Sequence, residues 1–123
     1  MEHIVNHLKS MLSFGGLFEK SKNINLPEVP NRYPMSLIVN TRTDTTDRNY
    51  WVVLFLNSDR TGEYFDPNGS KPTLPEVDEY LRRQCPNGIK YTSARHNDLM
   101  PTILHCIGYI NEKQNQIDRN LFC

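Results

Sequence analysis

The stretch from residue 50 to residue 69 decides the fold, and it reads Tyr-Trp-Val-Val-Leu-Phe-Leu-Asn-Ser-Asp-Arg-Thr-Gly-Glu-Tyr-Phe-Asp-Pro-Asn-Gly. Two runs rich in β-branched and aromatic residues flank a polar turn with a glycine, which predicts a β-hairpin over about 50–66. The first run is apolar at both alternating positions, so we expect a central strand covered on both faces. Pro67 and Gly69 end the second run. Asp66 is therefore expected beside Tyr50, at the same end of the hairpin.

The bulk composition predicts one domain over 1–123 with its own core, because 123 residues suffice for one. Basic and acidic residues number 14 each, which argues against a nucleic-acid surface. No apolar run approaches the roughly 20 residues of a membrane helix, and the N-terminus does not resemble a signal peptide. An odd number of cysteines without paired spacing (Cys85, Cys106 and Cys123) favours an intracellular, reducing compartment, either the cytoplasm or the nucleus.

Hydrophobic periodicity places the remaining elements. It predicts helices over 2–12, 74–85 and 100–112, and strands over 35–39, 50–57, 62–66 and 89–92. Residues 13–34 and 40–49 are expected to be loops. Thr73 and Glu76 have the spacing of a capping box at the start of the second helix. The fold class is therefore α+β, with a small mixed or antiparallel sheet packed between helices.

Two histidines lie four residues apart in the predicted N-terminal helix. His3 and His7 would share one helix face, but two histidines are too few for a structural zinc site. We therefore expect no metal and no cofactor.

Several short stretches carry a family resemblance. They are Phe-Gly-Gly-Leu-Phe at 14–18, Ser-Leu-Ile-Val-Asn-Thr at 36–41, Tyr-Trp-Val-Val at 50–53 and Glu-Tyr-Phe-Asp-Pro-Asn-Gly at 63–69. Together they resemble the adenovirus-type cysteine proteases (adenain), particularly the relatives encoded by Polinton/Maverick transposons and large DNA viruses. The resemblance runs in order from about residue 14 to about residue 110. It implies the papain-like core that this group shares with the Ulp-type SUMO-specific proteases.

In that family, a His directly before the Trp is the general base, and an acidic residue at the Asp-Pro-x-Gly position orients it. A Cys followed by Gly opens a buried helix as the nucleophile, and a Gln seven residues earlier helps to form the oxyanion hole. The resemblance places Tyr50, Asp66, Ile103 and His96 at these four positions, with Leu104 in place of the glycine. The carboxylate is kept, as is Trp51, and the other three catalytic positions are changed.

These substitutions predict a pseudoprotease, so we expect no enzymatic activity. Tyrosine is a poor base at neutral pH, because its ordinary pKa is about 10. The hydroxyl of Tyr50 can still donate a hydrogen bond to Asp66. Ile103 has no nucleophilic atom and is expected to plug the former cleft, while Leu104 fills the space that glycine would leave open.

The function expected from this pattern is that of a protein-interaction or scaffold module, domesticated from a transposon or a virus. A lost active site leaves a groove, and a polar loop leads into it. The candidate partner-binding residues are Thr43, Asp44, Asp47, Arg48, Tyr50, Trp51 and Asn68. The partner is a protein that the sequence does not identify. A further expectation is a homo-oligomer formed through the C-terminal helix, because apolar residues (Ile117, Leu121 and Phe122) lie near the C-terminus.

Two alternative functions stay open at this point. The first is a residual cysteine protease or SUMO/ubiquitin-like isopeptidase that uses Cys106. Against it, Ile107 rather than glycine follows Cys106, and Cys106 lies on the apolar stripe of its helix, where cysteine behaves as a small hydrophobic residue. The second is a nucleic-acid-associated factor, which the zero net charge makes the weaker alternative.

Overall fold

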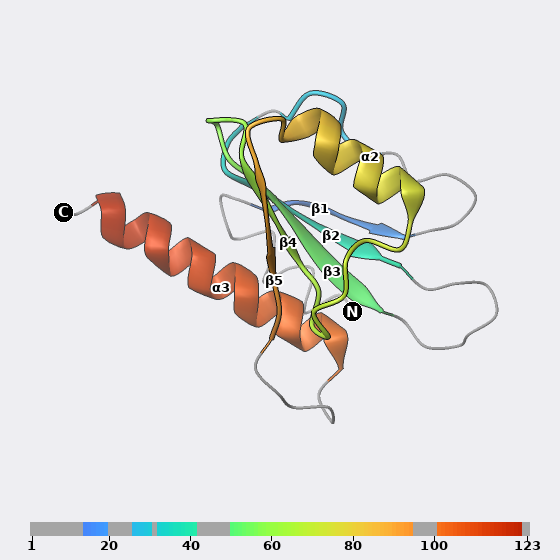
Figure 1. Ribbon diagram of the computed structural model, residues 1–123. Helices are drawn as coiled ribbons and strands as arrows, with labels where there is room; N and C mark the ends of the chain where they lie inside the picture. Colours follow the sequence, from blue (N-terminus) through green and yellow to red (C-terminus); the bar gives the residue numbers. More distant parts are fainter. Residues whose placement is uncertain (1–13, 20–25, 31, 42–49, 95–100, 122–123) are drawn as a thin grey trace.

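The computed structural model describes residues 14–19, 26–30, 32–41, 50–94 and 101–121. Within these residues the chain is an α+β protein with a five-stranded mixed sheet and two helices (Figure 1). The strands, in their order across the sheet, are β1 (Phe14–Glu19), β2 (Met35–Asn40), β3 (Trp51–Leu56), β4 (Gly62–Phe65) and β5 (Ile89–Thr92). The helices are α2 (Pro75–Gln84) and α3 (Thr102–Leu121).

The predicted hairpin forms the middle of the sheet. Strand β3 is antiparallel to both of its neighbours, whereas the outer pairs, β1 with β2 and β4 with β5, are parallel. The turn between β3 and β4 is closed by the N–H of Asn57, which donates to the carbonyl of Thr61 at 2.9 Å. The hairpin is confirmed, and its strands, like β2 and β5, end within one residue of their predicted bounds.

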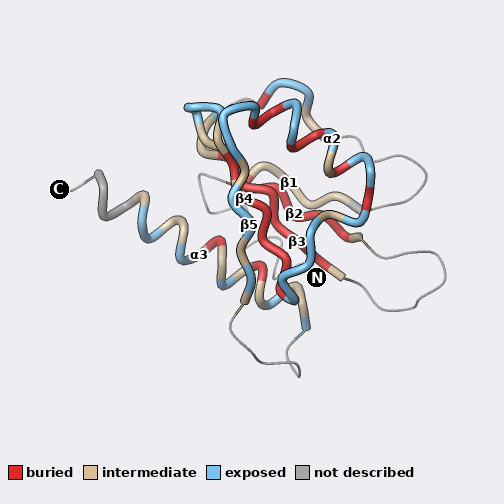
Figure 2. The backbone as a smooth tube through the Cα atoms, viewed as in Figure 1, coloured by how far each residue is buried: buried red, intermediate tan, exposed pale blue. Residues whose placement is uncertain are grey.

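The prediction that β3 is covered on both faces is also confirmed. Every residue of β3 is buried, because α2 packs on one face of the sheet and α3 on the other (Figures 1 and 2). Val52, Leu54 and Leu56 join the core on the α2 side, together with Val77, Tyr80 and Leu81. Trp51 and Val53 join the core on the α3 side, together with Phe65, Cys106 and Ile110. The two-residue alternation of a strand produces these two separate cores.

Three predictions about the elements are wrong. Residues 14–19 lie in the stretch expected to be a loop, but they form β1, because parallel pairing with β2 supplies the hydrogen bonds that the sequence pattern does not reveal. Helix α3 continues to Leu121, well past the predicted end at 112.

Helix α2 has Leu74 at its N-cap with no side-chain capping bond, so Thr73 does not form the expected capping box. Pro75, the first residue of α2, has no N–H and so removes one of the unpaired donors of the first turn. The predicted helix at 2–12 lies outside the described residues.

The turn of the hairpin supports the C-terminal end of α2. Arg60 has a φ of 65°, which is a left-handed conformation that costs free energy in a residue with a side chain. From this position, its Nε donates to the carbonyl of Gln84 at 2.9 Å and its Nη2 to the carbonyl of Arg83 at 3.1 Å. A guanidinium at these otherwise unsatisfied carbonyls is favourable both as a donor and as a cation at the negative end of the helix dipole.

We expect Arg60→Ala to lower the free energy of unfolding by about 1.5 kcal/mol, because it removes both bonds and leaves the left-handed backbone strain in place. The matched variant Arg60→Gly removes the same bonds but relieves the strain, so its cost should be about 1 kcal/mol smaller. Urea denaturation followed by the fluorescence of Trp51 measures both. A glycine variant less stable than the alanine variant would contradict this account.

Buried tyrosines make the fold sensitive to alkali. Burial, with a smaller contribution from neighbouring Tyr33, raises the pKa of Tyr80 to about 12, and burial also raises the pKa of Tyr64. In the unfolded chain a tyrosine has its ordinary pKa of about 10. The neutral hydroxyls therefore contribute stability that is fully present below about pH 10 and is lost as the pH rises toward 12.

We expect the urea midpoint to fall steeply above about pH 10, and Tyr80→Phe to reduce that fall. Urea titrations at several alkaline pH values, with tyrosinate absorbance recorded in parallel, provide the test. A midpoint that stays level between about pH 9 and pH 12 would show that these pKa values are not raised.

Candidate functional site

The candidate site is the hydrogen-bonded pair formed by Tyr50 and Asp66. The Tyr50 hydroxyl donates to Oδ1 of Asp66, as the sequence predicts. The backbone N–H of Asn68 donates to the same carboxylate oxygen at 2.8 Å and to the Tyr50 hydroxyl at 3.1 Å. Asp66 is only 4% exposed. Burial and the hydrogen bond to Asp66 together hold the pKa of Tyr50 well above its usual range. At neutral pH the tyrosine is therefore a donor and not a base.

The backbone of Tyr50 is held in place by the end of β2. Its N–H donates to the side-chain oxygen of Asn40 at 3.2 Å. Its carbonyl accepts from the N–H of Thr41 at 2.7 Å and from the Thr41 hydroxyl at 3.1 Å. Asn40 was expected to begin a loop, but it is the last residue of β2 and is buried. Sequence reasoning missed these two positioning residues, because only strand pairing brings them beside Tyr50.

Helix α3 begins beside this pair. The Thr102 hydroxyl accepts a hydrogen bond from the N–H of Trp51 at 2.9 Å, which joins the first turn of α3 to the start of β3. Ile103 is partly buried and packs against the core on the α3 side. The neighbouring Leu104 is 43% exposed, and the expectation that it occupies the space that a glycine would leave open stays a prediction. On a helix, adjacent residues point about 100° apart, and Ile103 takes the inward direction.

Trp51 does not serve as a partner contact in this conformation. Its side chain is 3% exposed and lies in the core beneath α3. The prediction that it contributes to a binding surface is therefore wrong, because alternate side chains of a strand point to opposite faces: Tyr50 packs against the core on the α2 side, and Trp51 is buried on the α3 side. Asn68 is exposed, as a contact residue must be. The other predicted contacts (Thr43, Asp44, Asp47 and Arg48) and His96 lie outside the described residues.

Cys106 lies beneath the same end of β3. Its side chain is fully buried, and its Sγ–H donates to the carbonyl of Trp51 at 3.2 Å. Burial, and to a smaller extent the charge of Asp66, holds the pKa of this thiol above its usual range. A thiol reacts as the thiolate, so both effects oppose nucleophilic chemistry at Cys106.

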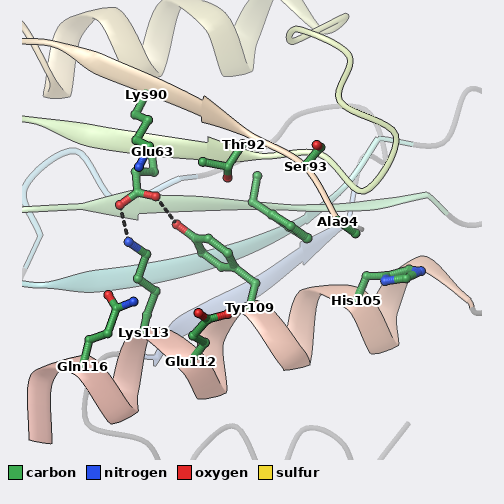
Figure 3. A pocket seen from close by; sticks show the side chains of 11 residues that line it. Glu63, Lys90, Thr92, Ser93, Ala94, His105, Tyr109, Glu112, Lys113 and Gln116 are labelled. Atoms are coloured by element: carbon green, nitrogen blue, oxygen red, sulfur yellow. Dashed lines mark hydrogen bonds and ion pairs between the residues drawn. The ribbon is translucent and has the colours of Figure 1, made fainter. Parts of the chain in front are cut away.

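Apart from the Tyr50–Asp66 pair, the structure has a hollow of about 680 Å³ between β5 and α3 (Figure 3). At its base the carboxylate of Glu63 accepts a hydrogen bond from the Tyr109 hydroxyl at 3.1 Å and forms an ion pair with Lys113. The Lys113 ammonium also lies 5.3 Å from the centre of the Phe55 ring. The sequence does not signal this cluster, since Glu63 is 46 residues from Tyr109 and 50 from Lys113.

The described residues contain no group of three or more His, Cys, Asp or Glu side chains placed to hold a metal ion. Over the same residues, neither helix is both long enough and apolar enough to cross a membrane. Tyr50 is half-buried and Asn68, which bonds to it, is exposed, so this site reaches the surface at Asn68.

We expect Tyr50→Phe to lower the free energy of unfolding by about 2 kcal/mol, because the buried carboxylate of Asp66 loses the hydrogen bond from the Tyr50 hydroxyl. Tyr91→Phe is the matched control, since Tyr91 is 41% exposed and lies on edge strand β5. Its cost should stay within about 0.5 kcal/mol. Equal costs for the two variants, measured by urea denaturation, would argue that the Tyr50 hydroxyl contributes nothing specific.

The fold and the site define the chain as an α+β protein with a mixed sheet between two helices in its described part, and with a tyrosine–aspartate pair where the hairpin strands meet α3. Comparisons with protein-family models and with curated proteins find no match to this chain.

Proposed function

We propose that this chain is a catalytically inactive domain of the adenain type, which acts as a protein-interaction module. The observation that supports the proposal most is the bond between Tyr50 and Asp66 beside the first turn of α3. In the cysteine proteases that the sequence resembles, a histidine and an acidic residue would be bonded in this way, and a cysteine would stand at the start of the helix. Here the corresponding side chains are a tyrosine, an aspartate and Ile103.

The chemistry of these side chains supports a binding role over a catalytic one. Transfer of a proton from a nucleophile requires a base with a pKa near the working pH, and the pKa of Tyr50 is raised instead. Isoleucine offers no atom that could form a covalent intermediate. The half-buried Tyr50, the exposed Asn68 and the polar sequence of residues 42–49, which precedes Tyr50, support a surface that offers hydrogen-bonding groups to a partner protein.

The residual-protease alternative would need Cys106 as its nucleophile. That thiol is fully buried, donates to a backbone carbonyl and has a raised pKa. A substrate could reach it only after α3 separated from β3. We therefore favour the interaction module, and we extend the proposal to an origin in a transposon or virus and to a location in the cytoplasm or nucleus.

The proposal includes self-association through α3. The second half of this helix extends beyond the sheet in Figure 1. Sedimentation velocity over a range of concentrations tests this part separately. A single monomeric species at every concentration would remove it and leave the partner surface at Tyr50 unaffected.

The decisive experiment installs a photo-crosslinking phenylalanine analogue at Asn68 in the full chain, expressed in its native cells. The matched control carries the same analogue at Glu76, an exposed residue of α2. We expect discrete protein adducts from position 68 that are absent from position 76. Reversing the charges of Asp44, Asp47 and Arg48 together should abolish these adducts. Identical adducts from both positions, or adducts that persist after charge reversal, would overturn the proposed surface.

A further inference from the structure

A short segment, residues 26–30, lies at the opposite end of the hairpin from Tyr50. Buried side chains of α2 hold it in place through hydrogen bonds. The hydroxyl of Tyr80 donates to the carbonyl of Pro27 at 2.8 Å, and Nε2 of Gln84 donates to the carbonyl of Glu28 at 2.7 Å. Tyr80 and Gln84 are 3% and 7% exposed. Two buried polar groups of α2 therefore fix the path of this segment.

The segment presents an apolar side chain to solvent. Val29 is 79% exposed, the highest value among the large apolar side chains of the described residues. Because the carbonyls of Pro27 and Glu28 are bound to α2, the backbone before Val29 is already ordered. A partner that contacts Val29 would not have to meet the entropic cost of ordering that backbone.

A hollow of about 400 Å³ lies beside Val29. Pro30 lines it from the same segment, and Tyr33 lines it from the residues just before β2. Arg83 lines it from the end of α2 and Arg60 from the hairpin turn. We call these four residues, together with Val29, the Val29 surface.

The charge of this hollow is positive. Two guanidinium groups, Arg60 and Arg83, line it against one carboxylate, Glu28, which leaves a formal charge of +1. The bonds from Arg60 to the end of α2 hold its guanidinium in a fixed orientation. Arg83 pairs with Glu79 at 3.5 Å, but both side chains are largely exposed, so this pair is weak and exchangeable. Guanidinium groups bind carboxylates with two parallel hydrogen bonds.

We propose that the Val29 surface binds an acidic peptide segment of a partner protein, in which an apolar side chain lies next to carboxylates. The apolar side chain packs on Val29, and the carboxylates pair with Arg60 and Arg83. This surface is separate from the site at Tyr50, because the β3–β4 strands place the two at opposite ends of a hairpin about 20 Å long. The inference therefore stands independently of the proposed function.

The test is a selection from a displayed library of random peptides with the purified full chain as bait. We expect the selected sequences to be enriched in Asp and Glu next to an apolar residue. A synthetic peptide of the enriched sequence, labelled with a fluorophore, then gives affinities by anisotropy. Its binding should weaken as salt rises, because the contacts include exposed charges.

Three variants locate the binding surface. Val29→Ser and Arg83→Glu should each weaken binding of the peptide at least about tenfold, which corresponds to about 1.4 kcal/mol. Arg82→Glu is the matched control: it makes the same charge change one residue away, on a side chain that pairs with Asp78 and does not line the hollow. Its effect should be about threefold or less. Arg60 is left intact, since it supports the end of α2. Val29 and Arg83 are exposed, so neither variant disturbs the core.

Several outcomes would overturn the inference. One is a selection that enriches no sequence, or enriches basic ones. Another is equal weakening by Arg82→Glu and Arg83→Glu, which would indicate a diffuse charge effect. A third is a stronger affinity for a single-stranded oligonucleotide than for the acidic peptide, which would indicate a nucleic-acid surface. None of these outcomes would change the crosslinks expected from Asn68, so failure here is distinguishable from failure of the proposed function.

Discussion

Lys113→Met should lower the free energy of unfolding by about 3 kcal/mol, because it leaves the carboxylate of Glu63 without its counter-charge at the base of a hollow. The side chains of Lys113 and Glu63 are 18% and 12% exposed, so water solvates the isolated carboxylate poorly. Among the described residues, the hydrogen bond that Glu63 would keep comes from the neutral hydroxyl of Tyr109. Methionine keeps most of the volume of the lysine stem against the Phe55 and Tyr109 rings. The loss therefore reports the charge and not the packing.

A second substitution separates the ion pair from its surroundings. In Glu63→Gln/Lys113→Met, the buried charge is absent and the amide oxygen can still accept from Tyr109, so we expect a cost of only about 1 kcal/mol. Arg82→Met is the surface control: Arg82 and Asp78 form a pair at 3.0 Å, but the side chains are 73% and 36% exposed. Its cost should stay below about 0.5 kcal/mol. Urea denaturation of the four proteins measures all of these values. If Lys113→Met proves no costlier than Arg82→Met, the cluster does not hold α3 on the sheet.

Alkylation of Cys106 in the native protein should be at least about 100-fold slower than in the unfolded chain, since reaction requires a transient opening that exposes the thiol and lets it ionise. The buried position of the side chain and its bond to the carbonyl of Trp51 both oppose reaction. The raised pKa of the thiol reduces the thiolate fraction further. This prediction bears on function directly, because a cysteine protease needs an accessible thiolate.

Mass spectrometry of peptides after timed treatment with iodoacetamide measures the rate at each cysteine. The same protein in guanidinium chloride provides the unfolded reference rate for Cys106. Cys85 is an internal comparison, because it is also buried and burial also raises its pKa. Native Cys106 that reacts as fast as the unfolded reference, together with a peptidase activity lost in Cys106→Ala, would replace the interaction module with a residual protease.

Local sequence patterns predicted the hairpin and its orientation well. A strand that is apolar on both faces is expected to be covered on both faces of its sheet. A polar turn with a glycine is expected to reverse the direction of the chain. These two signals suffice to place Tyr50 beside Asp66, and their hydrogen bond follows from the chemistry of the two groups. By contrast, β1 was missed because the glycines of residues 14–19 resemble a loop, and pairing with β2 overrides that local preference.

By itself, the sequence determined the α+β class, the central strand and the donor–acceptor pair at Tyr50, because each depends on residues that are adjacent or joined by one short turn. Only the tertiary structure decided which side chains are accessible. It turned Trp51 and Cys106 inward, left Leu104 and Val29 exposed, and joined Glu63 to Lys113 across 50 residues. The physical reason is that burial and ion pairing depend on which surfaces the helices cover. That choice is made by packing between elements far apart in the chain, for which a local pattern carries no signal.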